Sequence, residues 1–373
     1  MDSRVSRRIA AAALFSTLLP ATVFAQTEIT VPVLVPITGF LSLEGTSQRN
    51  GALLAIKNAP ASVKINSSVT DTGASPEGAS TALERSLARS KVTAVAASML
   101  GPQMLAMMPI ALENKVPLAT VSGTADLTEK KNPYVFRFFP GDAIAKAAHV
   151  RYVVEEMKKK RVALVYQTTA YGQGGRAQII EQLKQAGLAP VMEEALEVSV
   201  KDMSAVLGKV QAANPDVVML HLHGGPSALF LKQAAAAKLA VPVVAGSGLS
   251  QPSTAALLEP AELKNVCAET NASPVATGNS PEMEKFLAQY RTEFKSEPDG
   301  FAVGQYDALG MIIEAAGKGA KTPEAMTRYL STSSYKGLAM TYKSDGKGNM
   351  AHSSIIICYD GATRTPRIAK RYD

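Results

Sequence analysis

Short apolar runs alternate with segments that carry apolar residues at helical spacing along most of the chain. Continuous runs rich in β-branched residues, such as 29–37 and 161–166, predict buried strands of a parallel sheet. Segments such as 77–89 and 173–186 place apolar residues on one face and predict helices. Because strand and helix alternate in short periods, we expect an α/β fold with parallel-rich sheets and right-handed crossovers.

Three segments interrupt this alternation. The segment 134–140 is extended and ends at a proline, 271–279 is loop-like, and 344–349 is a polar turn. We interpret these segments as crossings between two doubly wound lobes. The lobes are expected to comprise residues 26–140 plus 272–345 and residues 141–271 plus 346–373.

The first 25 residues have the pattern of a secretory signal peptide. Three arginines precede an apolar run over 9–19 and small residues at 23–25. This run is too short to cross a membrane as a helix. We therefore expect a periplasmic protein that is secreted through a cleavable signal peptide and is soluble after cleavage.

The formal net charge of +7 excludes few classes of function. The first 25 residues contribute three Arg and one Asp, so +5 remains in the mature chain. Lysines and glutamates are interspersed, which is typical of ordinary solubilising charge. No stripe of Lys and Arg carries interleaved aromatic residues, so binding of nucleic acid is not expected.

Two cysteines, Cys267 and Cys358, lie in separate expected strands. An oxidising compartment would allow them to form a disulfide. Sequence alone does not place their Cα atoms within bridging range. Two buried, unpaired cysteines therefore remain the alternative.

In open α/β sheets, ligands bind beyond the C-terminal ends of the strands. The loops at these positions are rich in Gly, Ser and Thr and precede helix N-termini, whose free N–H groups favour carboxylates and other polar small molecules. These loops cover 38–45, 98–102 and 122–126 in the first lobe, and 167–174, 223–226 and 246–250 in the second. We expect a small-molecule site between the lobes.

Gly172 and Gly174 match the spacing of a dinucleotide-binding fingerprint. Residues 167–171 separate the first glycine from the strand, whereas in a dinucleotide site the glycine follows the strand directly. A secreted chain also has little access to a nicotinamide cofactor, so no cofactor is expected. The glycines are interpreted either as a flexible loop leading into a helix or as the setting of Tyr171 in the cleft.

His221 and His223 would share one face of a strand, because residues two apart point the same way. A metal site needs a third ligand, and none lies close in sequence. We interpret His221 as a core residue and His223 as a cleft residue, with no metal. The chain also lacks a G-x-S-x-G elbow, an H-E-x-x-H helix and a P-loop, so an enzyme is not expected.

A set of motifs resembles the leucine/isoleucine/valine-binding family of type I periplasmic solute-binding proteins, in order over nearly the whole mature chain. The motifs are LVPITG at 34–39, NPYVFR at 132–137, AYGQG at 170–174, NPDVV at 214–218, LKQA at 231–234 and YDA at 306–308. The resemblance implies two Rossmann-like lobes, three hinge crossings and closure around a small ligand. It also implies delivery of the ligand to an ABC transporter membrane permease, and a monomer is expected.

The resemblance further implies binding positions in the first lobe. The loop after the third strand usually offers serines to the ligand carboxylate. Here it reads Leu100 and Gly101, which leaves backbone N–H groups and Ser98. Ser122 and Thr124 match the small residue and the threonine of the loop after the fourth strand.

Tyr171 matches the second-lobe tyrosine that closes over the ligand, and Phe301 is expected to add an apolar wall. Ser247 stands where an acidic residue usually pairs with the ligand α-ammonium. A desolvated ammonium without such a partner costs on the order of several kcal/mol. Glu44 and His223 stand where aromatic residues are common, and Glu44 either pairs with a cationic group or points to water.

We therefore expect the ligand to be a small carboxylate without a standard α-amino group, such as an aromatic or 2-oxo acid. An amino-acid or amide binder and a ligand-sensing receptor module of the same fold are the alternatives. The expected ligand-binding residues are Glu44, Ser98, Leu100, Gly101, Ser122, Thr124, Tyr171, His223, Ser247 and Phe301.

Overall fold

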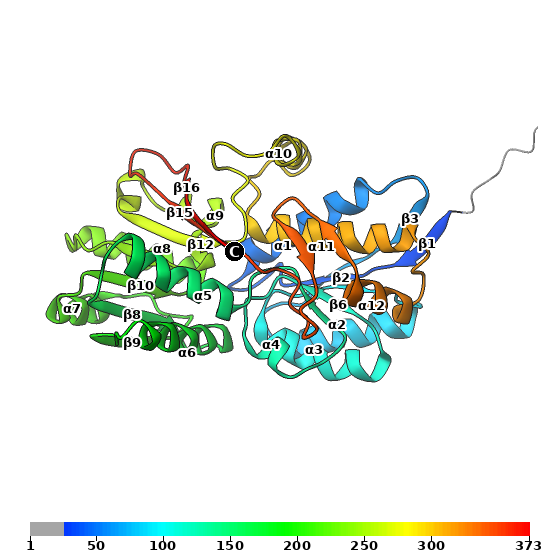
Figure 1. Cartoon of the computed structure of the whole chain (residues 1–373), viewed down its shortest axis with the longest axis horizontal. Coiled ribbons are helices and arrows are strands. Elements are labelled where there is room, and N and C mark those ends of the chain that lie inside the picture. Colours follow the sequence, from blue (N-terminus) through cyan, green and yellow to red (C-terminus); the bar gives the residue numbers. More distant parts are fainter. Residues whose placement is uncertain (1–25) are drawn as a thin grey trace, which may run out of the picture.

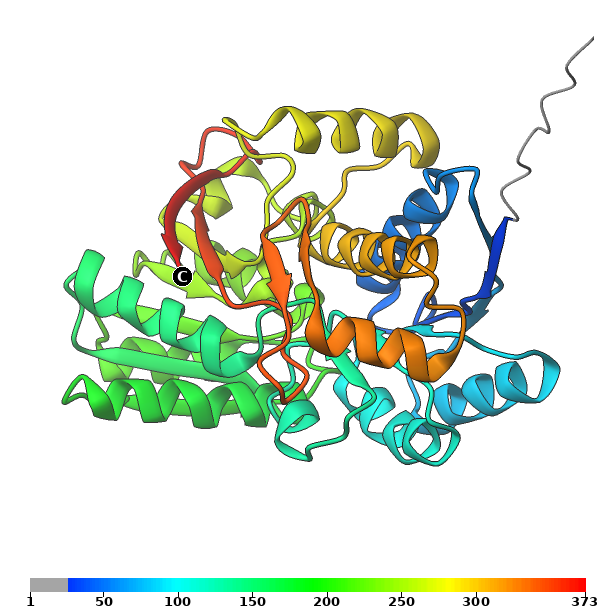
Figure 2. The same ribbon diagram turned by 45° about the vertical axis from the view of Figure 1, so that its right-hand side comes forward.

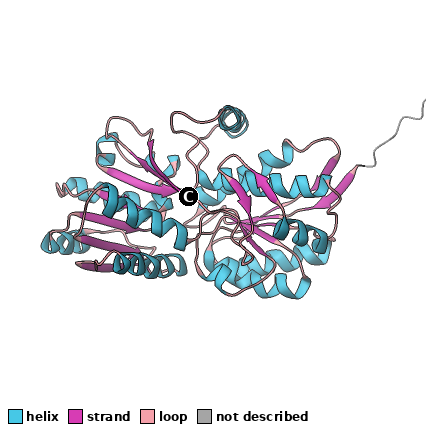
Figure 3. Ribbon diagram, in the orientation of Figure 1, coloured by secondary structure: helices cyan, strands magenta, loops and turns pink. Residues whose placement is uncertain are grey.

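The computed structural model of the protein describes residues 26–373, so the expected signal peptide lies outside the described residues. Two β-sheets, each covered by helices, lie beside one another along the long axis of the molecule (Figures 1 and 3). This arrangement confirms the α/β fold with parallel-rich sheets. Among the described residues, no helix has the length and apolar character needed to cross a bilayer.

The first sheet contains five parallel strands in the order β4-β2-β5-β6-β7. Apolar residues of α1 and α11 pack on one face, and those of α2 and α3 pack on the other. The bounds are β2 (Val33–Val35), β4 (Val69–Asp71), β5 (Val95–Ala97), β6 (Leu118–Thr120), β7 (Val135–Arg137), α1 (Ser42–Lys57), α2 (Pro76–Arg89), α3 (Gly101–Asn114) and α11 (Gly300–Gly317).

The expectation of one continuous strand over 29–37 is wrong. The strand β1 (Thr27–Thr30) pairs with β3 (Val63–Asn66) in a separate two-stranded sheet, and only β2 enters the main sheet. Pro32 lies between β1 and β2, and a proline has no N–H to donate to a sheet ladder. The segment 63–70 is also divided between the two sheets, because β3 pairs with β1 and β4 pairs with β2.

The second sheet contains seven strands in the order β16-β15-β12-β11-β10-β8-β9. The strands β8 to β12 pair in parallel, whereas β15 and β16 are antiparallel additions at the edge. Apolar residues of α5 and α6 pack on one face and those of α7 and α8 on the other. The bounds are β8 (Val162–Gln167), β9 (Met192–Leu196), β10 (Val217–His221), β11 (Val243–Ala245), β12 (Val266–Thr270), β15 (Ser354–Cys358), β16 (Arg367–Tyr372), α5 (Asp142–Arg151), α6 (Ala170–Gln185), α7 (Ser204–Ala213) and α8 (Gly224–Ala236).

The helix α5 is followed directly by one π-helical segment, η1 (Tyr152–Glu156). The strand β16 and the hairpin of β13 and β14 were not expected from the sequence. The remaining elements are α4 (Asp126–Glu129), η2 (Ser247–Leu249), α9 (Pro252–Ala255), η3 (Pro260–Leu263), α10 (Pro281–Phe294), α12 (Pro323–Thr332), β13 (Ser334–Lys336) and β14 (Thr341–Lys343).

The chain passes between the two sheets after β7, after β12 and again between β14 and β15. Figure 2 shows the third passage, where the chain leaves the orange hairpin of β13 and β14 and continues into β15. On this basis we propose lobes that comprise 26–140 plus 272–345 and 141–271 plus 346–373.

A disulfide joins Cys267 on β12 to Cys358 on β15. The two residues lie opposite each other in the antiparallel ladder, and 91 positions separate them in sequence. Sequence alone could not establish this pairing. The register of β12 and β15 makes the disulfide possible, because that register places the two Cα atoms 4.0 Å apart.

Candidate functional site

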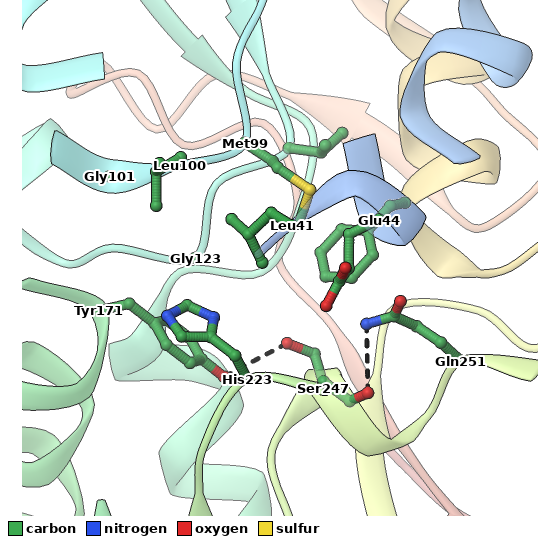
Figure 4. A pocket seen from close by; sticks show the side chains of 13 residues that line it. Leu41, Glu44, Met99, Leu100, Gly101, Gly123, Tyr171, His223, Ser247 and Gln251 are labelled. Carbon is green, nitrogen blue, oxygen red and sulfur yellow. Dashed lines mark hydrogen bonds between the residues drawn. The ribbon is translucent and has the colours of Figure 1, made fainter. Parts of the chain in front are cut away.

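A pocket lies between the two sheets, where the loops that follow β5, β6, β8, β10 and β11 meet (Figure 4). The open space within it is about 400 Å³, a figure that includes solvent at its mouth. The first lobe contributes most of its apolar wall, and the second lobe contributes most of its polar side chains. The lining residues are Leu41, Glu44, Met99, Leu100, Gly101, Val121, Gly123, Tyr171, His223, Ser247, Gly248, Gln251 and Phe301.

Three residues that the sequence analysis placed in the site do not line this pocket. The Ser98 hydroxyl donates to Gln103 Oε1 at 2.6 Å and accepts from the Leu100 N–H at 3.1 Å, so it organises the loop from behind. Ser122 and Thr124 are 1% exposed, and their hydroxyl oxygens lie 3.4 Å apart. The other seven expected residues line the pocket.

Thr124 lies directly behind Gly101. A Cβ atom on Gly101 would be 2.2 Å from Thr124 Oγ1, so a side chain at position 101 would displace the threonine. The close approach brings together the start of α3 and the loop after β6. The N–H groups of Gly101, Gly123 and Thr124, which lie in these two segments, donate to no acceptor among the described residues.

Glu44 lies in the first turn of α1 and is 4% exposed, so the expectation that it points to water is wrong. Its carboxylate reaches across to the second lobe, toward Ser247 and Gln251 (Figure 4). Burial raises the pKa of Glu44 to about 7, and the charge of Asp299 acts in the same direction. Hydrogen bonds from the Gly224 N–H and from Gln251 act in the opposite direction and favour the charged carboxylate.

Tyr171 lies in the first turn of α6, which Thr169 caps by accepting a hydrogen bond from the Gly172 N–H. Its hydroxyl lies 3.4 Å from Ser247 Oγ. The ring centroid is 5.2 Å from that of His223. The side chain is thus fixed on the second-lobe wall of the pocket.

The glycines near Tyr171 serve packing. A Cβ atom on Gly172 would be 1.9 Å from the Gln167 carbonyl oxygen, and one on Gly175 would be 1.9 Å from His221 Nε2. Glycine at these positions lets the start of α6 approach β8 and β10. The glycines belong to the helix itself, and the interpretation as a flexible loop is wrong.

His221 is fully buried and donates from Nε2 to the Tyr171 carbonyl oxygen at 2.9 Å, as a core histidine would. His223 lines the pocket, with Nε2 at 3.3 Å from Thr169 Oγ1. Burial lowers the pKa of His223 to about 4, so the imidazole is neutral at neutral pH. The described residues contain no group of three or more His, Cys, Asp or Glu side chains arranged to hold a metal ion.

A buried ionic cluster lies behind Tyr171 in the second lobe. Lys146 pairs with Glu269, and His149 Nδ1 lies 3.3 Å from the same carboxylate. Burial alone would raise the pKa of Glu269, but Lys146 and His149 hold it at about 2. Lys146 Nζ also lies 5.9 Å from the centroid of the Tyr171 ring. The sequence analysis did not find this cluster, because its members are far apart in the chain.

Six lining residues were also missed. Leu41, Met99 and Gly123 lie within the loops that the sequence analysis assigned to the site, so their positions carried a signal. Gln251 is fully buried and follows the loop 246–250 by one residue. No Lys or Arg is among the described residues that line the pocket. The remaining missed residues are Val121 and Gly248, and Gly248 also lies within an expected loop, 246–250.

Comparison with known proteins identifies relatives over most of the chain. A family model described as periplasmic binding protein matches residues 28–359. A Leu/Ile/Val-binding protein of Rhizobium johnstonii is 27% identical over 249 residues, which are 64% of this chain and 67% of that protein. A leucine-, isoleucine-, valine-, threonine- and alanine-binding protein of Pseudomonas aeruginosa is 23% identical over 340 residues, which are 88% and 90% of the two chains.

Solved structures share the fold. A leucine-binding protein from Thermotoga maritima superposes with a TM-score of 0.84 at 21% identity and covers 92% of this chain and 99% of its own. A solute-binding protein from Rhodopseudomonas palustris in complex with benzoate gives a TM-score of 0.81 at 19% identity, with 92% and 96% covered. Another solute-binding protein, from R. palustris BisB5 in complex with 3,4-dihydroxybenzoic acid, gives a TM-score of 0.80 at 21% identity. The superposition covers 93% of this chain and 98% of that chain.

The family match agrees with the two sheets, the three passages between them and the pocket at the strand ends. This family is periplasmic and serves transport. The chain belongs to the periplasmic binding protein family, among its Leu/Ile/Val-binding members, and is a solute-binding protein of ABC transport and not an enzyme.

Proposed function

We propose that the protein captures a small carboxylate without a standard α-amino group, such as an aromatic or 2-oxo acid, and delivers it to an ABC permease. The observation that carries this proposal is the set of backbone N–H groups without a protein acceptor at Gly101, Gly123 and Thr124. Such groups stabilise an anionic oxygen without a basic side chain. The apolar residues Met99, Leu100 and Phe301 would contact the body of the ligand.

Two further points support a ligand without an ammonium group. Ser247 is neutral at the position where relatives are expected to carry an acid. Similar structures from R. palustris hold benzoate and 3,4-dihydroxybenzoic acid, although identities near 20% relate the folds and not the ligands.

Glu44 favours a second candidate, a ligand with an ammonium or amide group. A carboxylate in a pocket whose described lining has no Lys or Arg would attract a cation. The Gly224 N–H and Gln251 already bond to Glu44, however, and burial raises its pKa to about 7. Near neutral pH it is therefore in part uncharged, which makes it a weaker partner for an ammonium group.

Calorimetry separates these candidates. The protein would first be unfolded and refolded to remove any ligand acquired during expression. It would then be titrated with benzoate, 4-hydroxybenzoate, 4-methyl-2-oxopentanoate and leucine. We expect at least one acid to bind more tightly than leucine. Tight binding of leucine, with no binding of the acids, would establish the second candidate instead.

We also propose export through the N-terminal segment, a monomeric state in solution and a membrane permease as partner. Membership of a periplasmic family supports export. The expected signal peptide itself, residues 1–25, lies outside the described part of the chain. Light scattering of the purified protein measures the oligomeric state. A neighbouring permease gene would favour transport, whereas a neighbouring kinase gene would favour a sensor.

A further inference from the structure

Arg137 is the last residue of β7 and is 2% exposed. It lies behind the pocket loop and not in the lining. Its guanidinium donates from Nη1 to the carbonyl oxygens of Gly123 at 3.2 Å and Thr124 at 2.6 Å. From Nη2 it donates to Thr128 Oγ1 at 2.6 Å. The five N–H groups of a guanidinium lie in a fixed plane and suit such a set of acceptors, which a lysine could not match.

These contacts fix the direction of the loop amides. In a trans peptide the N–H points opposite to the C=O. Because the Gly123 carbonyl points at Arg137, the Thr124 N–H points away from it. The Thr124 carbonyl is held in the same way, and the next N–H, that of Ala125, bonds to the Asp142 carboxylate. Arg137 therefore leaves the Thr124 N–H directed away from the protein groups behind the loop.

The position of Arg137 is tightly enclosed. A Cβ atom on Gly141 would lie 2.7 Å from Arg137 Cζ, so the glycine makes room for the guanidinium. Burial lowers the pKa of Arg137 to about 10, while the charges of Asp142, Asp345 and Glu129 act in the opposite direction. The side chain is therefore still protonated at neutral pH. It places a positive charge behind a pocket wall that has no described Lys or Arg of its own.

Arg137 also connects this loop to the third passage between the lobes. Its Nε and Nη2 donate to Asn349 Oδ1 at 3.0 and 2.6 Å. Asn349 in turn donates from Nδ2 to Asp345 Oδ2 at 2.7 Å. Backbone bonds join the same segments, from the Arg137 N–H to the Gly348 oxygen at 2.8 Å and from the Met350 N–H to the Arg137 oxygen at 3.0 Å. The first and third passages thus meet at one side chain.

We propose that Arg137 is a positioning residue that selects for an anionic ligand group by holding the Gly123–Thr124 peptide with its N–H toward the pocket, and that Asn349 fixes its guanidinium. This inference rests on the proposed carboxylate ligand. It assigns specificity to a residue that contacts the ligand only through the backbone of the loop.

The test compares each acid with its uncharged amide. Calorimetry would use benzoate and benzamide, 4-hydroxybenzoate and 4-hydroxybenzamide, and 4-methyl-2-oxopentanoate and its primary amide. In Arg137→Lys we expect the affinity for the acid to fall about tenfold, which is the effect of one lost charge-assisted hydrogen bond. The affinity for the amide should change less than about twofold, so that the acid-to-amide ratio falls.

A second variant covers the case in which Arg137→Lys does not fold. Asn349→Ala keeps Arg137 and its bonds to Gly123 and Thr124 but removes the acceptor that orients the guanidinium. The acid-to-amide affinity ratio should therefore fall by a smaller factor than in Arg137→Lys. The matched control is Asn279→Ala. Asn279 is a half-buried asparagine of the second passage that donates to Ser273, Pro274 and Ala276 oxygens. The acid-to-amide affinity ratio of Asn279→Ala should equal that of the wild type.

Thermal unfolding of each ligand-free variant separates positioning from a purely structural role. A structural role would lower the unfolding midpoint and weaken acid and amide equally, which would overturn the inference. An unchanged ratio in both Arg137→Lys and Asn349→Ala overturns it as well. If Arg137→Lys is unfolded, the ratio in Asn349→Ala decides. A wild type that binds leucine and none of the acids would instead remove the proposed ligand class, and the inference with it.

Discussion

The neighbours of Tyr171 hold its ring on the pocket wall more firmly than its hydroxyl does. The 3.4 Å separation from Ser247 Oγ is long for a hydrogen bond between hydroxyl groups. The His221 ring centroid, in contrast, lies 4.0 Å from that of the tyrosine. His221 itself bonds to the Tyr171 carbonyl. The ring is therefore positioned before a ligand arrives.

Replacing Tyr171 tests its part in binding. In Tyr171→Ala we expect ligand affinity to fall by about tenfold or more, because an aromatic contact in a desolvated site is lost. Calorimetry measures the affinity, and circular dichroism checks that the fold is retained. Tyr134→Ala removes a half-buried tyrosine of the first lobe, outside the pocket, and serves as the control. Unchanged affinity in Tyr171→Ala would place the site elsewhere.

Two pocket residues should make closure depend on pH in opposite directions. Burial raises the pKa of Glu44 from 4.5 to about 7 and lowers that of His223 from 6.5 to about 4. If solvent reaches both groups in the open form, closing adds a proton to Glu44 between pH 4.5 and 7. Closing also removes a proton from His223 between pH 4 and 6.5. The two effects nearly cancel in the wild type.

Single variants should reveal each effect. In His223→Gln only Glu44 titrates, so affinity should fall as pH rises from 4.5 toward 7. In Glu44→Gln only His223 titrates, so affinity should be highest above pH 6.5 and fall as pH drops toward 4. Calorimetric titrations across pH 4 to 8 measure both profiles. Two flat profiles would mean that neither group changes its exposure on closure.

The site shows what sequence reasoning can supply at the level of single residues. The loops were found because the C-terminal ends of parallel strands meet at one edge. Which side chain of a loop faces the pocket depends on the local backbone path, so Ser98, Ser122 and Thr124 were placed in the lining and lie behind it. Glu44 could be located but its burial could not, because the groups that surround it come from the other lobe.

At the level of elements, sequence periodicity located most helices and buried strands of both sheets. Its errors fall at strand ends and edges. Pro32 divides one apolar run between two sheets, although the run is continuous in sequence. The strand β16 has a single buried residue, Tyr372, and is rich in Arg and Lys, so its apolar signal is weak. Its position depends on pairing with β15, which sequence periodicity does not encode.

The disulfide between β12 and β15 should contribute strongly to stability. Linking residues 91 positions apart restricts the unfolded chain, by about 4.6 kcal/mol in the chain-entropy model. We expect Cys267→Ala/Cys358→Ala to unfold at a lower guanidinium concentration than the wild type. Dithiothreitol should shift the wild type toward the variant and leave the variant unchanged. Equal midpoints with and without reductant would show that the bond adds no stability.

At the level of the whole molecule, contacts between the lobes at the pocket indicate a closed form. Glu44 of the first lobe meets the Gly224 N–H of the second. The Phe40 ring lies 5.3 Å from the His223 ring across the same boundary. Since three chain passages join the proposed lobes within residues 26–373, rotation about these passages would separate these contacts. A hinge motion of this kind is expected of a protein that must admit and release its ligand.

Small-angle X-ray scattering measures this motion. The ligand-free protein should have a larger radius of gyration than the protein saturated with its ligand. Glu44→Ala, which removes a contact between the lobes, should shift the saturated protein toward the open value. If the radius of gyration is the same with and without ligand, the lobes do not move apart and another route of ligand entry is needed.

The position of β15 also affects the order in which the chain can fold during synthesis. Residues 272–345, which lie between the passages, are made after β12 and before β15. Cys267 must therefore remain without its partner until a further 91 residues have emerged. Neither lobe can finish folding before synthesis of the other has begun, because each contains sequence that is made after part of the other. Export that delays the last 30 or so residues would leave β12 with an unpaired edge, a surface that promotes aggregation.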